Sequence, residues 1–260
     1  MSNKDITYFG ITPKEKLLKD CINELQKIYA AHSAYLWGGS GQIIGKTTID
    51  EIIAAEKTSD DPLVNARRVL AFVGKLIEKG YNLDKAQFFD CSGLVLYVLE
   101  KFGLYIGDNT ANGLYDLGEK ISVSKAKAGD LVFLGTPTHK HHVGFVIGDG
   151  KVIECKGRDK GVVTSALESW EYAAHYTWFD DLKLTRKLKV ASTPMTGADV
   201  LNVQRALCSH GFSCACNGSF TTNTEAAVKR YQKAAKLAVV SYGVVAKKTA
   251  ESLGITWAKK

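Results

Sequence analysis

The sequence predicts an α+β fold in which helices come first and antiparallel strands follow, with a small helical unit after them. Apolar residues recur at helical spacing through residues 13–102, and the pattern changes to that of strands from about residue 128. Helical spacing returns near residue 198. Because helices and strands are segregated rather than alternating, a doubly wound sheet is excluded.

The first predicted helix covers residues 13–31 and begins near Pro13. Its apolar face consists of Leu17, Leu18, Cys21, Ile22, Leu25 and Ile28. A glycine turn follows at Tyr35-Leu36-Trp37-Gly38-Gly39.

Residues 41–88 are expected to be an insertion that carries its own helix. Asp60-Asp61-Pro62 is a start signal for this helix, and Gly80 is a stop signal. The predicted apolar side of the helix comprises Leu63, Leu70, Val73 and Ile77. We expect the insertion to line the rim of a cleft.

Cys91 is the most informative residue of the chain. It lies in Phe89-Asp90-Cys91-Ser92-Gly93, directly before an amphipathic stretch that runs to Phe102. A thiol in the first turn of a helix meets unpaired backbone N–H groups and the positive end of the helix dipole, which favour the thiolate. The same N–H groups can hold the oxyanion of a tetrahedral intermediate.

Two predicted strands place a base and a carboxylate after this nucleophile. His142 opens a strand that ends at Gly148, 51 residues after Cys91, and Glu154 follows 12 residues later in the strand 151–155. Nucleophile, base and orienting group therefore appear in the order expected of a cysteine hydrolase.

The turn between these strands decides whether His142 and Glu154 share a face. A two-residue turn at Asp149-Gly150 would place them on opposite faces, whereas a three-residue loop at residues 148–150 pairs Gly144 with Glu154. Because Gly150 suits the left-handed position of a three-residue loop, we predict that loop, with Ile147 opposite Lys151.

The chain is predicted to contain two domains, over residues 1–188 and 197–260, joined by a polar linker at 189–196. The second is expected to be an all-α three-helix unit. From Thr193 to Lys260 there are nine Lys and Arg against three Asp and Glu, a net charge of +6 out of +7 for the whole chain. A basic surface favours polyanions such as nucleic acids, lipid headgroups or teichoic acids.

Several function classes find no support in the sequence. The chain begins without the apolar run of a secretory signal, and no stretch approaches 18 apolar residues, so no membrane insertion is expected. A nucleic-acid-binding motif is not found. The six cysteines are scattered, which favours free thiols in a reducing compartment.

Five segments resemble the successive motifs of the NlpC-type cell-wall cysteine peptidases. They are Tyr35-Leu-Trp-Gly-Gly, Asp90-Cys91-Ser92-Gly93, Ala128-Gly-Asp-Leu, His142-Val-Gly and Val152-Ile-Glu154. The resemblance covers roughly residues 15–180 and implies a papain-like fold. Two departures are Glu154, where histidine is commoner in the family, and the long gap between Gly39 and Cys91.

The resemblance also implies roles for individual residues. Cys91 would be the nucleophile, His142 the general base and Glu154 the third polar residue. The substrate-binding positions implied are Tyr35, whose hydroxyl would lie beside the nucleophile, together with Trp37, Asp90, Ser92 and His141. No cofactor is implied. The scissile bond would lie between γ-D-glutamate and the following diamino acid, as in a DL-endopeptidase, or next to L-alanine, as in an N-acetylmuramoyl-L-alanine amidase.

Residues 195–255 resemble a three-helix peptidoglycan-binding domain. The matching segments are Gly197-Ala-Asp199-Val200, Val203-Gln204-Arg-Ala-Leu207, Asn217-Gly218-Ser-Phe220, Thr224-Glu-Ala-Ala-Val228 and Tyr231-Gln232. Both resemblances predict bacterial peptidoglycan, expected to be a Gram-positive wall, as the partner. With no signal visible, the arrangement resembles a bacteriophage endolysin held in the host cytoplasm until a holin releases it to the wall.

Three alternatives stay open at this point. His139, His141 and His142 could bind a metal, although no matching carboxylates accompany them. Cys208, Cys214 and Cys216, with His210 nearby, could be reduced thiols, a disulfide or a zinc site. The first domain could also be a wall-binding module without activity, which slow alkylation of Cys91 near pH 6 would indicate.

Overall fold

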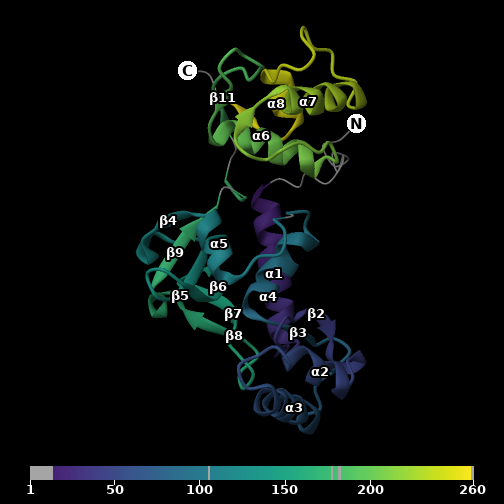
Figure 1. Cartoon of the computed structure of the whole chain (residues 1–260), viewed down its shortest axis with the longest axis vertical. Coiled ribbons are helices and arrows are strands. Elements are labelled where there is room, and N and C mark those ends of the chain that lie inside the picture. Colours follow the sequence, from purple (N-terminus) through teal and green to yellow (C-terminus); the bar gives the residue numbers. More distant parts are fainter. Residues whose placement is uncertain (1–13, 105, 177, 181–182, 259–260) are drawn as a thin grey trace. The chain divides into compact units, whose positions relative to one another are not determined.

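Helices precede the main sheet in the structure, as the sequence predicts. The computed structural model describes residues 14–104, 106–176, 178–180 and 183–258, and its chain divides into two units, Leu17–Phe179 and one that contains Asp180–Lys260 (Figure 1). In the first unit, α1 (Lys14–Ala30), α4 (Cys91–Lys101) and α5 (Ala111–Leu117) enclose the larger core with one face of the sheet. The α+β prediction is therefore confirmed.

The main sheet has six antiparallel strands in the order β4-β9-β5-β6-β7-β8. Their bounds are β4 Glu119–Ile121, β9 Tyr172–His175, β5 Leu131–Gly135, β6 Lys140–Gly148, β7 Lys151–Cys155 and β8 Val162–Ala166. Side chains alternate between the two faces: Phe133, Phe145 and Ile153 enter the core under the helices, whereas Val132, Val146 and Val152 pack against Trp170 on the other face. Short 3₁₀ turns lie at Val123–Lys125 and Leu167–Ser169.

The β6–β7 hairpin has the predicted pairing but a different turn. Gly144 lies opposite Glu154, as predicted, yet Gly148 rather than Ile147 lies opposite Lys151. The turn is thus the two-residue Asp149-Gly150, whose positive φ angles of 51° and 66° suit a type I′ turn. A bulge between Val146 and Gly148 takes up one residue and restores the register. The predicted three-residue loop is wrong, because a two-residue turn together with a bulge gives the same pairing of Gly144 with Glu154.

The segment 41–88 folds into more than the single predicted helix. After β1 (Ala34–Tyr35) and β2 (Ser40–Ile43) come a 3₁₀ turn at Ile44–Lys46, α2 (Ile49–Glu56) and α3 (Pro62–Glu78), and β3 (Gln87–Phe89) returns between β1 and β2. Figure 1 shows α2 and α3 beside β2 and β3. Thr48 forms a capping box with Glu51 at the start of α2.

The buried face of α3 is only partly the predicted one. Leu70 and Val73 pack against the core of the insertion, as predicted. Leu63 and Ile77 are 67% and 61% exposed, while Ala66, Val69 and Leu76 are buried, together with Asn65. Apolar residues occupy both sides of this helix, so spacing alone did not locate the face that packs against α2 and β1.

The second unit contains the three predicted helices, α6 (Ala198–Ser209), α7 (Thr222–Ala234) and α8 (Lys247–Ser252). It is not purely helical, because β10 (Lys183–Leu184) pairs with β13 (Thr256–Trp257), and β11 (Met195–Thr196) pairs with β12 (Ser219–Phe220). The unit begins earlier than the predicted linker at 189–196. Leu184 and Leu188 are fully buried in its core, which ties this part of the chain to the helices.

Two buried glutamines support the loops of the second unit in the same way. Gln204 donates to the Ser219 carbonyl at 2.9 Å and accepts from the Gly218 N–H at 2.8 Å. Gln232 donates to the Val244 carbonyl and accepts from the Gly243 N–H, both at 2.8 Å. Each side chain thus replaces backbone partners that the loops lack.

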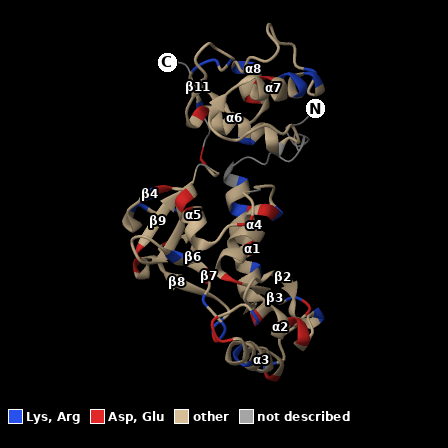
Figure 2. Cartoon of the chain, viewed as in Figure 1, with Lys and Arg blue, Asp and Glu red and all other residues tan. Residues whose placement is uncertain are grey.

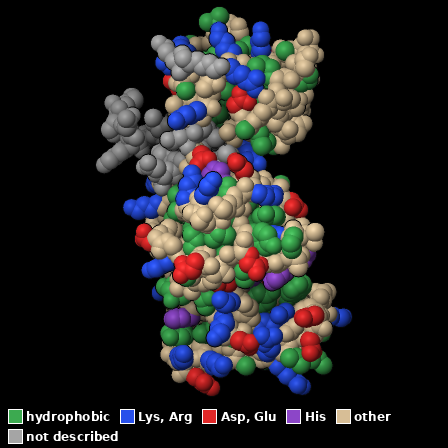
Figure 3. All heavy atoms as spheres, turned by 90° about the vertical axis from the view of Figure 1, so that its left-hand side faces the viewer, with side chains coloured by type: hydrophobic (Ala, Val, Ile, Leu, Met, Phe, Trp, Pro, Cys, Tyr) green, Lys and Arg blue, Asp and Glu red, His purple; other side chains and the backbone are tan. Residues whose placement is uncertain are grey.

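Lys and Arg residues are interspersed with Asp and Glu residues along the ribbon of the first unit (Figure 2), whereas the face of the second unit drawn in Figure 3 shows more Lys and Arg than Asp and Glu. Within the described residues, no helix has the length and apolar character needed to cross a membrane.

The close approach of α4 to the turn after β1 generates a stability prediction. A Cβ atom at Gly93 would lie 2.0 Å from the Gly39 carbonyl oxygen, which accepts a hydrogen bond from the Asp90 N–H. Gly93→Ala should therefore lower the free energy of unfolding by about 1–3 kcal/mol in urea titrations. In the control Gly74→Ala, within α3, the new Cβ meets nothing within 4 Å, and a gain of about 0.5–1 kcal/mol is expected. Equal stability of Gly93→Ala and the unmodified chain would contradict the packing.

Candidate active site at the start of α4

Cys91 is the first residue of α4, and Asp90 caps this helix. The Asp90 carboxylate accepts hydrogen bonds from the Gly93 N–H at 2.6 Å, the Ser92 hydroxyl at 3.1 Å and the Gly38 N–H at 3.1 Å. Burial raises the pKa of Asp90, although these hydrogen bonds oppose the rise. Asp90 and Ser92 therefore fix the nucleophile's turn, and their predicted contact with substrate stays a prediction.

His142 and Glu154 form a direct hydrogen bond. The His142 Nε2 atom lies 2.7 Å from the Glu154 Oε2 atom, and the two side chains are 14% and 2% exposed. Glu154 is opposite Gly144 on the neighbouring strand, so it is the diagonal neighbour of His142 on one face of the sheet. The contact predicted from the strand register is present.

The His142 ring carries a strongly shifted pKa. Burial lowers it, but hydrogen bonds with Cys91 and with Glu154 and the charges of both groups more than offset burial, so the pKa rises to about 9. The pKa of Glu154 is lowered: burial acts against this, and the hydrogen bonds with His142 and Ser165 outweigh it. The pair thus favours an imidazolium beside a carboxylate.

The nucleophile lies next to this pair. The Cys91 Sγ atom is 3.9 Å from the His141 carbonyl oxygen, and its side chain also interacts with the His142 ring. Because Glu154 occupies Nε2, the nitrogen of His142 left for Cys91 is Nδ1. Strand β6 therefore contributes both a ring nitrogen and a backbone carbonyl to the surroundings of the thiol.

Two residues that the sequence did not single out hold the His142–Glu154 pair. The Trp170 ring stacks on the His142 ring, with 5.5 Å between centroids and 8° between planes. The Trp170 Nε1–H donates to the Ser165 hydroxyl at 3.2 Å, and Ser165 also bonds Glu154. Both come from the strand and turn after β7, where no sequence motif marks them.

The remaining predicted residues have different surroundings. Tyr35 is buried, and its ring lies under the Arg158 guanidinium. The Trp37 side chain is 45% exposed, and the His141 side chain is exposed. Their predicted contacts with substrate stay predictions.

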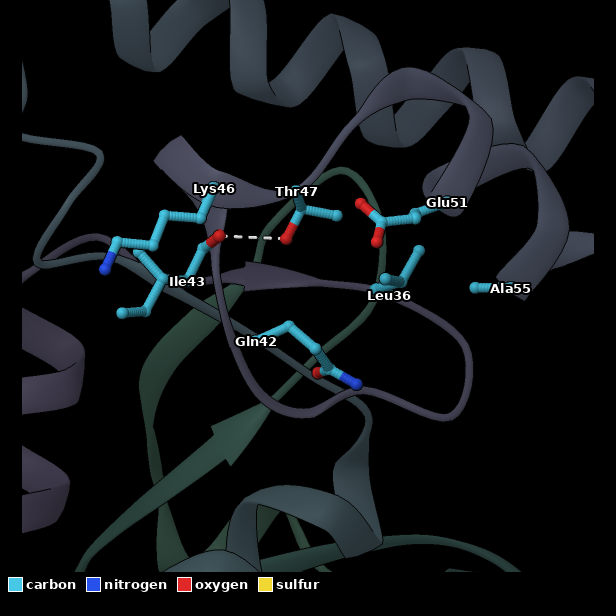
Figure 4. Close-up of a pocket in the computed structure, with 7 residues that line it drawn as sticks. All are labelled: Leu36, Gln42, Ile43, Lys46, Thr47, Glu51 and Ala55. Atoms are coloured by element: carbon cyan, nitrogen blue, oxygen red, sulfur yellow. Dashed lines mark hydrogen bonds between the residues drawn. The ribbon is translucent and has the colours of Figure 1, made fainter.

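A pocket of about 440 Å³ lies in the insertion rather than at Cys91 (Figure 4). It is lined by Leu36, Gln42, Ile43, Lys46, Thr47, Glu51 and Ala55. None of these is a predicted site residue, and the pocket is not the reaction centre.

The other cysteines differ from Cys91. The Cys155 thiol is fully buried, which raises its pKa well above the ordinary value, and it donates to the Phe89 carbonyl at 3.2 Å. In the second unit the Cys208 sulfur lies 3.4 Å from Cys216 and 4.0 Å from Cys214, too far for a disulfide bond of about 2.05 Å. Among the described residues, no three His, Cys, Asp or Glu side chains are placed to hold a metal ion.

The raised pKa of His142 generates a pH-dependent stability prediction. A folded pKa of about 9 against the ordinary 6.5 gives stability that is fully present below pH 6.5 and is lost as the pH rises through about 9. Glu154→Gln should therefore cost about 1.5–3 kcal/mol at pH 6 and clearly less at pH 9.5. Urea unfolding followed by tryptophan fluorescence measures this, since Trp37, Trp170 and Trp178 all lie in the first unit. An equal cost at both pH values would contradict the ionic pair, and Glu168→Gln, an exposed residue, is the control.

Curated relatives of the chain are named as endopeptidases. Probable endopeptidase p60 of Listeria grayi is 43% identical over 74 residues, which are 28% of this chain and 14% of that protein. The bifunctional muramidase/DL-endopeptidase CwlT of Bacillus subtilis is 36% identical over 98 residues, which are 36% of this chain and 29% of that protein. The chain thus spans less than a third of the length of either relative.

Among solved structures, the NlpC/p60 domain of the peptidoglycan hydrolase SagA aligns with 61% of this chain and 98% of that domain, at 26% identity and a TM-score of 0.38. Residues 78–180 match the NlpC/P60 family, and residues 196–253 match the peptidoglycan binding domain family. The first match contains Cys91, His142 and Glu154. The chain therefore carries an NlpC/P60 family domain followed by a peptidoglycan-binding domain.

Proposed function

We propose that this chain is a peptidoglycan hydrolase that cleaves an amide bond of the wall stem peptide through a Cys-His-Glu site. The single observation that carries the proposal is the hydrogen bond between His142 and Glu154 beside Cys91, at the start of a helix. The family matches of both segments support the polymer as substrate.

The reaction follows from the positions of these groups. The Cys91 sulfur attacks the scissile carbonyl carbon, and the His142 imidazolium gives its proton to the leaving amine as the C–N bond breaks, which leaves a thioester on Cys91. His142 then takes a proton from water, whose oxygen attacks the thioester. The C–S bond breaks and leaves the Cys91 thiolate beside the His142 imidazolium, and the acid that is released loses its proton to the solvent. Glu154 holds the ring in the orientation that serves both steps.

Backbone N–H groups of α4 are candidates for stabilising the oxyanion. The N–H groups of Ser92 and Gly93 already bond the Asp90 side chain. Within the described part of the chain, the Cys91 N–H has no such partner and lies on the reacting residue itself. We assign it to the oxyanion that forms when Cys91 attacks.

The most specific form of the proposal is a DL-endopeptidase that cuts between γ-D-glutamate and the following diamino acid. Its support is the sequence resemblance, together with the endopeptidase names of the relatives. An N-acetylmuramoyl-L-alanine amidase would use the same three residues on a neighbouring bond. The products distinguish the two.

The second unit would hold the enzyme on the wall. A tethered catalytic domain meets its substrate at a raised effective concentration without any new contact in the active site. The net charge of +6 over residues 193–260 suits the anionic polymers of a Gram-positive wall. Release by a bacteriophage lysis system stays a prediction of the sequence.

Mass spectrometry of the fragments released from purified Gram-positive walls tests the proposal. We expect fragments that end at D-glutamate, with a new free amine on the diamino acid, and a rate at least roughly 10³-fold lower for Cys91→Ala. Cys155→Ala removes the buried thiol at the end of β7. It is the matched control and is expected to retain activity.

Intact stem peptides freed from the glycan would instead indicate the amidase. If Cys91→Ala released the same fragments as the unmodified chain, the thiol mechanism would be wrong. Wall binding by a chain that yields no fragments from Gram-positive walls would contradict the hydrolase and favour a wall-binding protein.

A further inference from the structure

A buried ion pair links the insertion to the loop that follows the active-site hairpin. Glu56, the last residue of α2, is completely buried, and its carboxylate accepts hydrogen bonds from Arg158 Nε at 3.0 and 3.1 Å and from Nη2 at 2.6 Å. Arg158 lies between β7 and β8, four residues after Glu154, and its side chain is 11% exposed. Removal of either partner would leave a buried charge unpaired.

The same carboxylate also holds the chain after β1. Glu56 Oε1 accepts a hydrogen bond from the Trp37 N–H at 3.1 Å. The Arg158 guanidinium, fixed by Glu56, lies over the Tyr35 ring with its carbon 5.0 Å from the ring centroid. This is the geometry of a cation–π contact, which gains strength when both groups are shielded from water. Glu56 thus restrains the position of Tyr35 in two ways, through the hydrogen bond to the Trp37 N–H and through the Arg158 guanidinium.

Tyr35 in turn packs in the same core as Cys91, and it lies opposite Phe89, two residues before Cys91, on the neighbouring strand. Burial raises the pKa of its hydroxyl, and the charges of Cys91 and Asp90 raise it further, while Arg158 opposes the rise. The hydroxyl therefore stays protonated at neutral pH and can donate a hydrogen bond next to Cys91.

We propose that Glu56 and Arg158 are positioning residues that hold Tyr35 so that its hydroxyl donates to the substrate carbonyl attacked by Cys91. The inference rests on the proposed hydrolase function. It also gives the insertion a role, because Glu56 belongs to the insertion and acts on the position of Tyr35. Neither Glu56 nor Arg158 touches the reacting atoms. A planar guanidinium is required, because an ammonium group cannot bond the carboxylate through two nitrogens and stack on the ring at once.

A double-mutant cycle on the full chain tests this role. Arg158→Lys and Tyr35→Phe are each expected to lower kcat/KM on soluble muropeptides by about tenfold, the loss of roughly one hydrogen bond. Because Arg158 acts through the Tyr35 hydroxyl, Arg158→Lys should change kcat/KM by less than twofold in the Tyr35→Phe background. A full tenfold effect in both backgrounds would show that Arg158 only stabilises the fold and would overturn the proposal. Glu56→Gln, which keeps its size and one acceptor oxygen, replaces Arg158→Lys if that variant melts early.

The matched control is the neighbouring ion pair between Arg68 of α3 and Asp159. It joins the same helical insertion to the same loop, at 2.5 Å, but its side chains are 44% and 56% exposed. Arg68→Lys should leave kcat/KM unchanged within twofold. A tenfold loss in this control would mean that any disturbance of the loop slows the reaction.

A second readout separates this proposal from the proposed function. NMR of the chain with ¹³C-labelled tyrosine follows the Tyr35 ring without any substrate. Arg158→Lys and Glu56→Gln should speed the flipping of this ring, and Arg68→Lys should not. Faster flipping in a chain that hydrolyses no muropeptide would uphold the positioning while the hydrolase proposal failed. Unchanged flipping in both variants would overturn the positioning whether or not hydrolysis occurs.

Discussion

The register between β6 and β7 is the constraint on which the candidate site depends. A one-residue slip would move Glu154 to the other face of the sheet and leave the largely buried His142 ring without its carboxylate. The turn at Asp149-Gly150 alone would impose that slip, because it pairs Gly148 with Lys151. The bulge beside Val146 corrects it. A single unpaired residue near the hairpin's tip thus makes the two-residue turn compatible with the His142–Glu154 hydrogen bond on the same two strands.

The remaining elements bring other groups to this pair. Helix α4 packs beneath the same sheet and presents Cys91 at its N-terminus, while Asp90 fixes the first turn and the chain after β1. Trp170 covers the His142 ring on the face of the sheet opposite the helices. The insertion approaches from the side of β1 and β3, where Glu56 reaches Arg158 and the Trp37 backbone. Residues distant in sequence therefore hold a site whose chemical groups come from α4, β6 and β7.

The sequence predicted those parts of the fold that local patterns determine. Helical spacing after Cys91 located α4. The pairing of Gly144 with Glu154 was also predicted, although through a three-residue loop that the hairpin does not have. The sequence did not predict the bulge. Asp149 adopts a left-handed conformation, which depends on the pairing of the whole hairpin and not on the local sequence. The Glu56–Arg158 pair, 102 residues apart, depends on how the insertion packs, and apolar residues on both sides of α3 concealed its buried face. The boundary near residue 180 was missed because two leucines after it enter the second core.

We expect Cys91 and Glu154 together to keep His142 as an imidazolium through the neutral range. An NMR titration of the His142 ring in the full chain, assigned by its loss in His142→Gln, tests this claim most directly. A pKa of about 9 is predicted for the unmodified chain, with a clear fall toward the ordinary value in Glu154→Gln. A His142 pKa near or below 6.5 in the unmodified chain, or one unchanged by Glu154→Gln, would show that Glu154 does not stabilise the imidazolium.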